Sequence, residues 1–584
     1  MDQRTPGDVP EETGAARRDA GAAGAPRRDA DAPGAPRRDP ATAEREAQER
    51  IAAFMAAADA PDDGDADAPD DAPDDGAAAE SGTTTADEDE HEAGLRAVLG
   101  SALFTGPDPG VVEEVLHEEE AEPTDAERRA GAVAHAQAEE AVRGIYLDIL
   151  TRAPEHDVQP SLQRVADVLE LLGDPHRAYP VVHLTGTNGK TSTARMIERL
   201  LREKGLRTGR FTSPHLHSVR ERIALDGAPI SPEAFVATWE DVKPYVEMVD
   251  ARSQADGGPR LSFFEVFTVM AYAAFADAPV DVAVVEVGMG GRWDATNVAD
   301  GTVEVLTRID HDHERWLGHT LEEIAGEKVG IITDRSTVLS AAQEEEVDSV
   351  IMSAAAQHGA RLLRDGQDLA VVDRQLGVGG QLLTLRTPAG VYQDVFLPLH
   401  GEHQAHNALL ALAAVETFFG GGALDGGVVE QGFAGVDSPG RLELVRRSPT
   451  VLVDAAHNPA GIDALRAAVE EAFPFSHLVG VVGVMADKDA EGILAGLEPL
   501  LAEIVVTRAA TDRAMDVEEL AEVAADVFGE ERVHLAERLD DAIDKAATLA
   551  EADPEEVVTS TGILVAGSVL LAAEARALMG RATA

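Results

Sequence analysis

One short stretch constrains what this chain can fold into. Residues 181–192, VVHLTGTNGKTS, pass from apolar strand-forming residues through a glycine turn to a lysine and two hydroxyls, and a helical pattern follows over 193–204. Such a loop presents backbone N–H groups, a helix N-terminus and an ammonium to a polyphosphate, with a hydroxyl available to Mg²⁺. The usual phosphate-loop spacing is not met, because its first glycine would fall on Leu184. A glycine-rich turn with a surface lysine is therefore the alternative interpretation.

The scarcity of lysine favours the functional interpretation. The chain has only six lysines, at positions 190, 204, 243, 328, 488 and 545, because arginine occupies most basic positions. A lysine kept in the loop is more readily explained by its compact charge, which suits a phosphate.

Composition limits the class of protein. A length of 584 residues with 44% apolar residues predicts more than one domain. No apolar run reaches the ~20 residues that span a bilayer, and the polar, acidic N-terminus does not resemble a secretory signal. The absence of cysteine excludes disulfides and thiolate chemistry and fits a cytoplasmic protein. A net charge of −58 argues against nucleic acid or an anionic membrane as a partner.

The first 130 residues differ in texture from the rest. They contain 35 acidic and 12 basic side chains, repeat the phrase APRRD, and include the run PDDGDADAPDDAPDDG. With few large apolar residues they cannot offset the entropy of ordering, so we expect a disordered acidic tail over 1–130. Short amphipathic pieces are possible at 41–57 and 92–104.

The remainder predicts two α/β units. Apolar runs at 181–184, 282–287 and 303–309 read as buried parallel strands, separated by helices at 193–204 and 265–276. This is a doubly wound pattern, in which ligands bind beyond the carboxyl ends of the strands. Residues 370–398 predict antiparallel hairpins. A second, Rossmann-like unit is predicted with strands at 450–453, 478–483, 503–507 and 562–566. We place the domains at 131–437 and 438–584, with Pro439-Gly440 as a hinge.

Four side chains outside the loop fall where such a sheet places its active site. Ser213 lies in a turn before Pro214, Glu286 and the segment around His313 end two strands, and Lys328 lies on a helical stretch. Each has an ordinary explanation, as a turn residue, a helix cap, a core or surface histidine, and a solvated charge. Together they supply oxygen ligands and an imidazole near a phosphate loop, which suits Mg²⁺. No nucleophile elbow is present.

Ten ordered segments then resemble one family. They are TGTNGKTS, FTSPHL, SFFE, VVEVGMGGRWDATN, IDHDHERWLG, EIAGEKVGI, HQAHN, GRLE, DAAHNP and GVMADKD. This combination resembles the folylpolyglutamate synthase/dihydrofolate synthase branch of the Mur ligases over roughly 140–584, whereas the tail has no counterpart. Thr191, Trp293, Ala455 and an additional His311 are small departures that remove no functional group of the family.

The resemblance implies a role for each matching position. It places Lys190 on the β- and γ-phosphates, Mg²⁺ on Ser213, Glu286 and His313, and a carbamylated lysine at Lys328, since a free ammonium would repel two Mg²⁺ ions. The implied catalytic residues are Lys190, Glu286, His313 and Lys328. The implied nucleotide residues are Gly186, Thr187, Asn188, Gly189, Lys190, Thr191, Ser192, Asn407, Arg441 and Asp454. The implied substrate residues are Ser262, Phe263, Phe264, Glu265, Trp293, Asp294 and Ala295 for the pterin, and His457 and Ser568, with Asp454, on the glutamate side.

The activity implied by the resemblance is ATP-driven amide formation through an acyl phosphate. The substrates would be L-glutamate with tetrahydrofolate, folylpolyglutamate or dihydropteroate, and the cofactors ATP and Mg²⁺. We expect a monomer without nucleic-acid or membrane partners. A peptidoglycan-precursor Mur ligase and a non-catalytic ATP-binding regulator are the alternatives. The second should have lost Lys190, Glu286 or Lys328, and all three are present. Whether one or both pterin substrates are used, the length of the polyglutamate product and the purpose of the tail stay open.

Overall fold

The computed structural model describes residues 125–154, 159–551 and 561–581. Most of the expected acidic tail, including the pieces at 41–57 and 92–104, lies outside these residues. Residues 125–130 are a correction to the tail boundary, because they form the start of helix α4 (Asp125–Ile149). Their sequence DAERRA is rich in alanine, glutamate and arginine, which are strong helix formers, and the low complexity of the preceding segment concealed this.

An eight-stranded sheet forms the first α/β unit, in the order β4-β3-β2-β5-β1-β6-β7-β8. Its strands are β1 (Val181–Thr185), β2 (Thr208–Phe211), β3 (Ile223–Leu225), β4 (Ala228–Pro229), β5 (Val282–Glu286), β6 (Gly301–Leu306), β7 (Thr337–Ser340) and β8 (Arg361–Arg364). The ladders are parallel except where β3 pairs with β2 and β4. The predicted strands β1, β5 and β6 are confirmed as its centre, with β1 between the other two.

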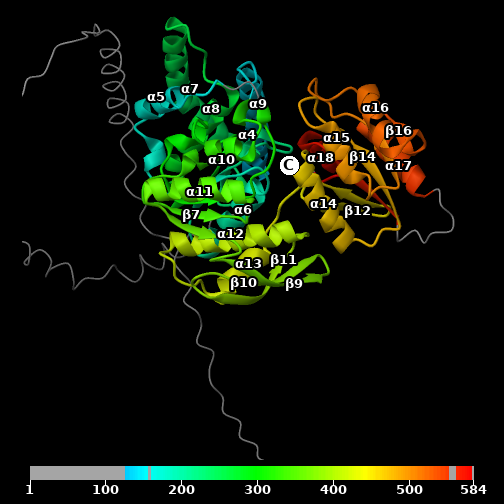
Figure 1. The fold of residues 1–584 in the computed structure, drawn as a ribbon. Coiled ribbons are helices and arrows are strands. Elements are labelled where there is room, and N and C mark those ends of the chain that lie inside the picture. The colour runs from blue at the N-terminus through cyan, green and yellow to red at the C-terminus, as the bar shows by residue number, and fades with distance from the viewer. Residues whose placement is uncertain (1–124, 155–158, 552–560, 582–584) are drawn as a thin grey trace, which may run out of the picture. The chain divides into compact units, whose positions relative to one another are not determined.

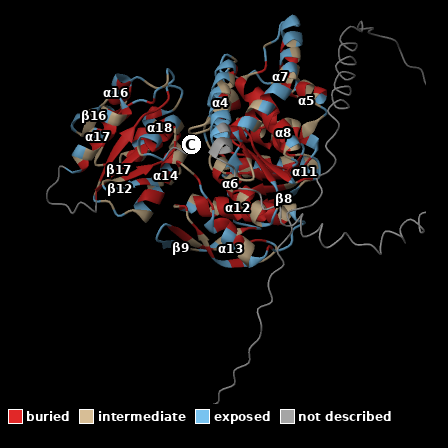
Figure 2. Ribbon diagram, turned by 180° about the vertical axis from the view of Figure 1, so that it is seen from behind, coloured by how far each residue is buried: buried red, intermediate tan, exposed pale blue. Residues whose placement is uncertain are grey.

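Helices cover both faces of this sheet. The helices are α5 (Gln163–Leu171), α6 (Lys190–Glu203), α7 (Pro232–Ala255), α8 (Phe263–Asp277), α9 (Glu314–Leu317), α10 (Leu321–Lys328), α11 (Glu345–His358), α12 (Glu402–Phe418) and α13 (Gly426–Ala434). Side chains alternate along each strand, so Val182 and Leu184 join the core made by α6 and α12, whereas Leu306 and Val338 join the core under α10 and α11. The buried strands appear as a red layer between helices in Figure 2.

The predicted hairpins are confirmed as a small antiparallel sheet in the order β11-β10-β9. Its strands are β9 (Ala370–Gly377), β10 (Gly380–Arg386) and β11 (Val391–Leu397). Leu383, Leu385 and Leu397 on this sheet belong to the same core as α12. The sheet therefore supports the helix that begins with the HQAHN segment.

The second α/β unit is a six-stranded sheet in the order β12-β13-β17-β14-β15-β16. Its strands are β12 (Glu443–Arg447), β13 (Thr450–Val453), β14 (His477–Val482), β15 (Glu503–Val506), β16 (Val533–Leu535) and β17 (Thr561–Ala566), and its helices are α14 (Pro459–Ala472), α15 (Ala490–Leu497), α16 (Val517–Phe528), α17 (Leu539–Ala550) and α18 (Val569–Leu578). All four predicted strands are present. Only β12 pairs antiparallel, and apolar cores fill both faces.

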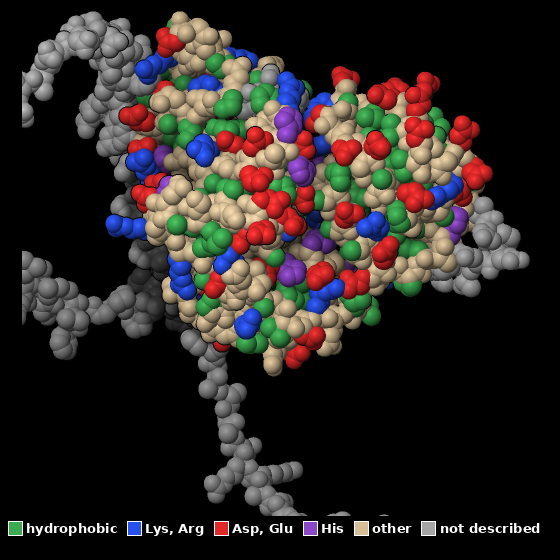
Figure 3. Space-filling model, viewed as in Figure 1, with side chains coloured by type: hydrophobic (Ala, Val, Ile, Leu, Met, Phe, Trp, Pro, Cys, Tyr) green, Lys and Arg blue, Asp and Glu red, His purple; other side chains and the backbone are tan. Residues whose placement is uncertain are grey.

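Two surface properties bear on partners. Acidic side chains are scattered over the face drawn in Figure 3. None of the helices in the described residues is long and apolar enough to cross a bilayer.

Candidate active site

A single cavity of about 570 Å³ collects every site residue proposed from the sequence. It is lined by the loop 186–192, by the pterin-side segments 262–265 and 293–295, by Ser213, Glu286, His313 and Lys328, and by Asn407, Arg441, Asp454, His457 and Ser568. These residues come from both α/β units and from chain positions almost 400 apart. Parallel strands explain the convergence, because the loops at their carboxyl ends share one edge of each sheet.

The phosphate loop is held in shape by close backbone approaches. Gly186 has φ +146°, and a Cβ there would stand 1.9 Å from the Thr307 hydroxyl oxygen. Gly189 has φ +91° and directly precedes α6, whose first residue is Lys190. The Lys190 Nζ donates to the carbonyl oxygens of Gly186 at 3.0 Å and Thr187 at 3.1 Å. Burial lowers the pKa of Lys190, against the opposing effect of Glu286. The Lys190 ammonium thus folds back onto the loop and is held by two of its carbonyl oxygens.

Glu286 at the end of β5 offers a buried carboxylate to this loop. Its side chain is 1% exposed, and its two oxygens accept from the Thr191 hydroxyl at 2.9 and 3.0 Å. Burial raises its pKa, with Lys190 acting in the opposite sense. No ion pair neutralises it within the described residues. A buried carboxylate beside a threonine hydroxyl matches the oxygen donors that Mg²⁺ prefers.

The other two proposed metal ligands are Ser213 and His313. The backbone of Ser213 lies close enough to Glu286 to help lower the pKa of that carboxyl, and the side chain of His313 is 37% exposed. Over the part of the chain that is described, no three or more His, Asp or Glu side chains form a metal-binding group. This donor set fits Mg²⁺, which binds through one or two carboxylates and keeps several waters.

Lys328 ends α10 and is buried against the same loop. Its Nζ donates to the Gly186 carbonyl oxygen at 2.7 Å, and its side chain is 4% exposed. Burial, followed by the charge of Lys190, lowers the pKa of Lys328 to about 7. Burial thus favours the neutral amine, which is the form that can add CO₂. The observation fits the carbamate that the family resemblance implies.

Two of the proposed nucleotide residues, Asp454 and Arg441, differ in whether their side chains already have hydrogen-bond partners. Asp454 accepts the backbone N–H groups of Leu442 at 2.6 Å and Ala456 at 2.7 Å, so its carboxylate also shapes the surrounding turn. The Arg441 side chain lines the cavity without a hydrogen-bond or ion-pair partner among the described residues. A guanidinium in this state is available to an anionic ligand.

Two of the proposed pterin-side residues, Ser262 and Glu265, make hydrogen bonds that stabilise the local backbone. Ser262 and Glu265 form a capping box at the start of α8, and Arg164 pairs with Glu265 at 2.8 Å. Phe263 presents its ring to the Arg222 guanidinium at 5.0 Å. An aromatic and cationic wall of this kind suits a flat, anionic substrate.

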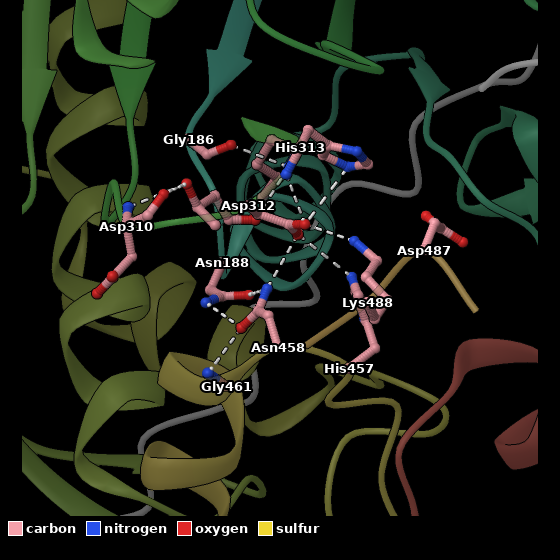
Figure 4. Close-up of polar contacts among 12 residues, drawn as sticks. Gly186, Asn188, Asp310, Asp312, His313, His457, Asn458, Gly461, Asp487 and Lys488 are labelled. Carbon is pink, nitrogen blue, oxygen red and sulfur yellow. Dashed lines mark hydrogen bonds and ion pairs between the residues drawn. The ribbon is translucent and has the colours of Figure 1, made fainter. Parts of the chain in front are cut away.

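Asp312 joins the two units beside the loop, as Figure 4 shows. Its carboxylate forms an ion pair with Lys488 and accepts from Asn458 Nδ2 at 3.0 Å. His457 Nε2 lies 3.6 Å away. Although burial alone would raise the pKa of Asp312, the neighbouring His457 and His313 rings and the Lys488 ammonium hold it well below its usual range. The Asn188 and Asn458 amides add a reciprocal pair at 3.1 and 3.2 Å.

Several cavity residues escaped sequence reasoning. Asp312, Lys488, His403 and Gln404 lie within the quoted segments IDHDH, GVMADKD and HQAHN, so those segments were the signal that could have identified them. Arg222 and Tyr146 lie outside every segment and reach the cavity only through tertiary packing.

Comparison with known proteins agrees with this two-part α/β fold. The Mur ligase middle domain matches residues 253–415, and the Mur ligase glutamate ligase domain matches residues 440–569. The fold and the cavity thus define a Mur-type ligase.

Individual relatives narrow the class. The dihydrofolate synthase/folylpolyglutamate synthase of Mycobacterium tuberculosis is 53% identical over 449 residues, covering 74% of this chain and 92% of the relative. The structure of M. tuberculosis folylpolyglutamate synthase complexed with ADP superposes with a TM-score of 0.74 at 50% identity, covering 76% of this chain and all of that one. The Escherichia coli FolC complex with DHPP and ADP has a TM-score of 0.62 at 29% identity, covering 72% and 94%. The chain belongs to the dihydrofolate synthase/folylpolyglutamate synthase family of ATP-dependent Mur ligases. A peptidoglycan-precursor enzyme is not favoured.

Proposed function

We propose that this protein joins the amino group of L-glutamate to the carboxylate of a pterin-linked substrate, using ATP and releasing ADP and phosphate. The observation that carries the proposal is the convergence of Lys190, Glu286 and Lys328 on one loop of a cavity that both α/β units line. ADP in the M. tuberculosis and E. coli complexes supports a nucleotide here.

In the first step the substrate carboxylate attacks the γ-phosphate of ATP. The loop 186–192 and Lys190 hold the phosphates, and Asn407, Arg441 and Asp454 hold the rest of the nucleotide. Mg²⁺ would be held by Glu286, Ser213 and His313, and when bound it supplies charge neutralisation during phosphoryl transfer. Lys328, as its carbamate, offers oxygens in place of an ammonium.

In the second step the amine of L-glutamate attacks the acyl phosphate. His457 and Ser568 line the cavity from the second α/β unit, where they are placed to receive glutamate. The pterin lies toward Phe263, Phe264 and Trp293. Closure of the two units excludes the water that would otherwise hydrolyse the intermediate.

One isotope experiment tests this order. Substrate labelled with ¹⁸O in its carboxylate should transfer one label to inorganic phosphate, because the acyl phosphate retains that oxygen until glutamate attacks. ADP release should require both L-glutamate and the pterin substrate. Phosphate without label would contradict an acyl phosphate intermediate. ADP release that does not depend on the pterin substrate would contradict the proposed ligase activity.

The same assay separates the two pterin substrates. We propose that the protein uses both tetrahydrofolates and dihydropteroate, as the double names of its relatives suggest. Comparable turnover with each supports a bifunctional enzyme, whereas turnover with only one restricts the function to that substrate. We further propose that it acts as a monomer in the cytoplasm.

A further inference from the structure

Strand β1 supports more than the phosphate loop. Its residues 183 and 185 project from the face opposite to Val182 and Leu184, which lie in the α6–α12 core. Thr185 donates its hydroxyl to the Gly290 carbonyl oxygen at 2.6 Å. His183 Nε2 lies 2.9 Å from the Thr296 hydroxyl oxygen. His183 and Thr185 therefore both contact the segment 288–296, which carries Trp293 and Asp294 into the cavity.

These hydrogen bonds have a defined direction. The Thr296 hydroxyl donates to Asp294 Oδ1 at 2.6 Å, and one hydroxyl has only one proton to give. It must therefore accept from His183, which places the imidazole proton on Nε2. His183 Nδ1 has no partner, as expected for the bare nitrogen of a neutral ring, and burial lowers the pKa of His183 to about 4.

Asp294 is the end of this chain of contacts and the only member that lines the cavity. Besides the Thr296 hydroxyl, it accepts the backbone N–H groups of Met289 at 2.9 Å and Thr296 at 3.0 Å. His183 and Thr296 are fully buried. Neither lines the cavity, so a specific effect on substrate binding would have to act through Asp294, which Thr296 contacts.

We propose that His183 and Thr296 are positioning residues that orient Asp294 toward the pterin substrate, and that β1 thereby supports the phosphate loop and the substrate turn together. The proposal rests on the proposed assignment of Trp293–Ala295 to the pterin side. It adds two residues that no cavity contact would reveal.

Thr296→Val tests the proposal because it removes the hydroxyl and nearly keeps the volume. We expect the KM for tetrahydrofolate to rise about tenfold, the size of a lost hydrogen bond to a charged group, while the KM for ATP changes less than about twofold. Thr296→Ser restores the hydroxyl and should restore the KM. His183→Phe removes the donor and should show the same split between the two KM values.

The matched control is Ser336→Ala. Ser336 donates to the buried carboxylate of Glu304 at 2.7 Å on the same sheet, outside the cavity. It should lower the melting temperature without changing either KM. If Thr296→Val behaves in this way, the two residues are merely structural and the proposal is overturned.

Two further measurements keep the outcomes distinct. Asp294→Asn tests the pterin assignment itself: an unchanged tetrahydrofolate KM in that variant overturns both proposals. A raised KM there with a normal KM in Thr296→Val overturns only the positioning role. Should Thr296→Val fail to fold, ¹⁵N NMR of histidine-labelled wild-type protein decides, since a proton on His183 Nδ1 contradicts the hydrogen-bond chain.

Discussion

The Asp312 carboxylate and the Lys488 ammonium form an ion pair between the loop after β6 and the loop after β14. Their side chains are only 8% and 11% exposed. The two α/β units thus meet through a shielded charge pair directly beside the phosphate loop.

A double-mutant cycle should reveal this pair as a functional unit. Asp312→Asn and Lys488→Met should each reduce kcat/KM, because each leaves one partner buried without its counter-charge. The double variant should lose less than the sum of the two, with a coupling of about 1 kcal/mol or more. Strictly additive losses would show that the two side chains act independently and that their ion pair does not contribute to turnover.

Lys190→Ala should lower kcat at least about a hundredfold, because a charge that stabilises the transferring phosphoryl group is removed. Lys204→Ala is the matched control, since Lys204 follows the same helix at its other end and is exposed. Melting temperatures of the two variants should be similar. Near-normal turnover in Lys190→Ala would refute the phosphate-loop assignment.

Lys328→Ala and Lys328→Arg should both lose most activity, because neither can form a carbamate. Acetate should partly restore Lys328→Ala, whose cavity can admit a small carboxylate, and should not restore Lys328→Arg. Full activity of the arginine variant would contradict the carbamate.

The wild-type protein supplies a pH test of the same group. Because burial and Lys190 bring the pKa of Lys328 to about 7, the amine is protonated below that pH and cannot add CO₂. At a fixed CO₂ concentration, activity should fall as the pH drops through 7, and degassed protein should recover with added bicarbonate at pH 8. Activity at pH 8 that does not depend on the CO₂ concentration would indicate that Lys328 acts without a carbamate.

Removal of residues 1–124 should leave activity and melting temperature nearly unchanged, because that segment has few large apolar residues to bury. Removal of 1–149 is the sharp comparison, since it also deletes α4. This helix buries Val142 and Ile149, and its Tyr146 lines the cavity. We expect a loss of about 3 kcal/mol or more from the two buried side chains. Equal melting temperatures for the two truncations would contradict the packing of α4.

Glu304 should make stability depend on pH. Burial raises its pKa to about 7 against the hydrogen bonds from Ser336 and Thr333, so the folded state binds its proton more tightly than the unfolded chain does. Its contribution is complete below about pH 4 and is lost as the pH rises through 7. Between pH 5 and 8 the free energy of unfolding should fall by about 2 kcal/mol more in wild type than in Glu304→Gln. Urea titrations that give both proteins the same pH dependence would refute this.

The elements that could be predicted from the sequence are those with a strong local pattern of apolar residues or glycines. The apolar runs of β1, β5 and β6 and the glycine turns of β9–β11 were identified because their periodicity is strong. The edge strand β8, with sequence RLLR, was missed because two of its four residues are charged and its pairing with β7 is long-range. Arg222 was missed for a related reason, since only tertiary packing brings it over Phe263. The directions of the hydrogen bonds around Asp294 likewise depend on contacts that no spacing reveals.

The six lysines divide evenly, and this has a practical consequence. Lys190, Lys328 and Lys488 line the cavity, whereas Lys204, Lys243 and Lys545 do not. Among the lysines, a bulky resin or dye that reacts with amines would therefore attach on α17, on α7 or just beyond α6. Immobilised in this way, the protein would keep its cavity open to small molecules.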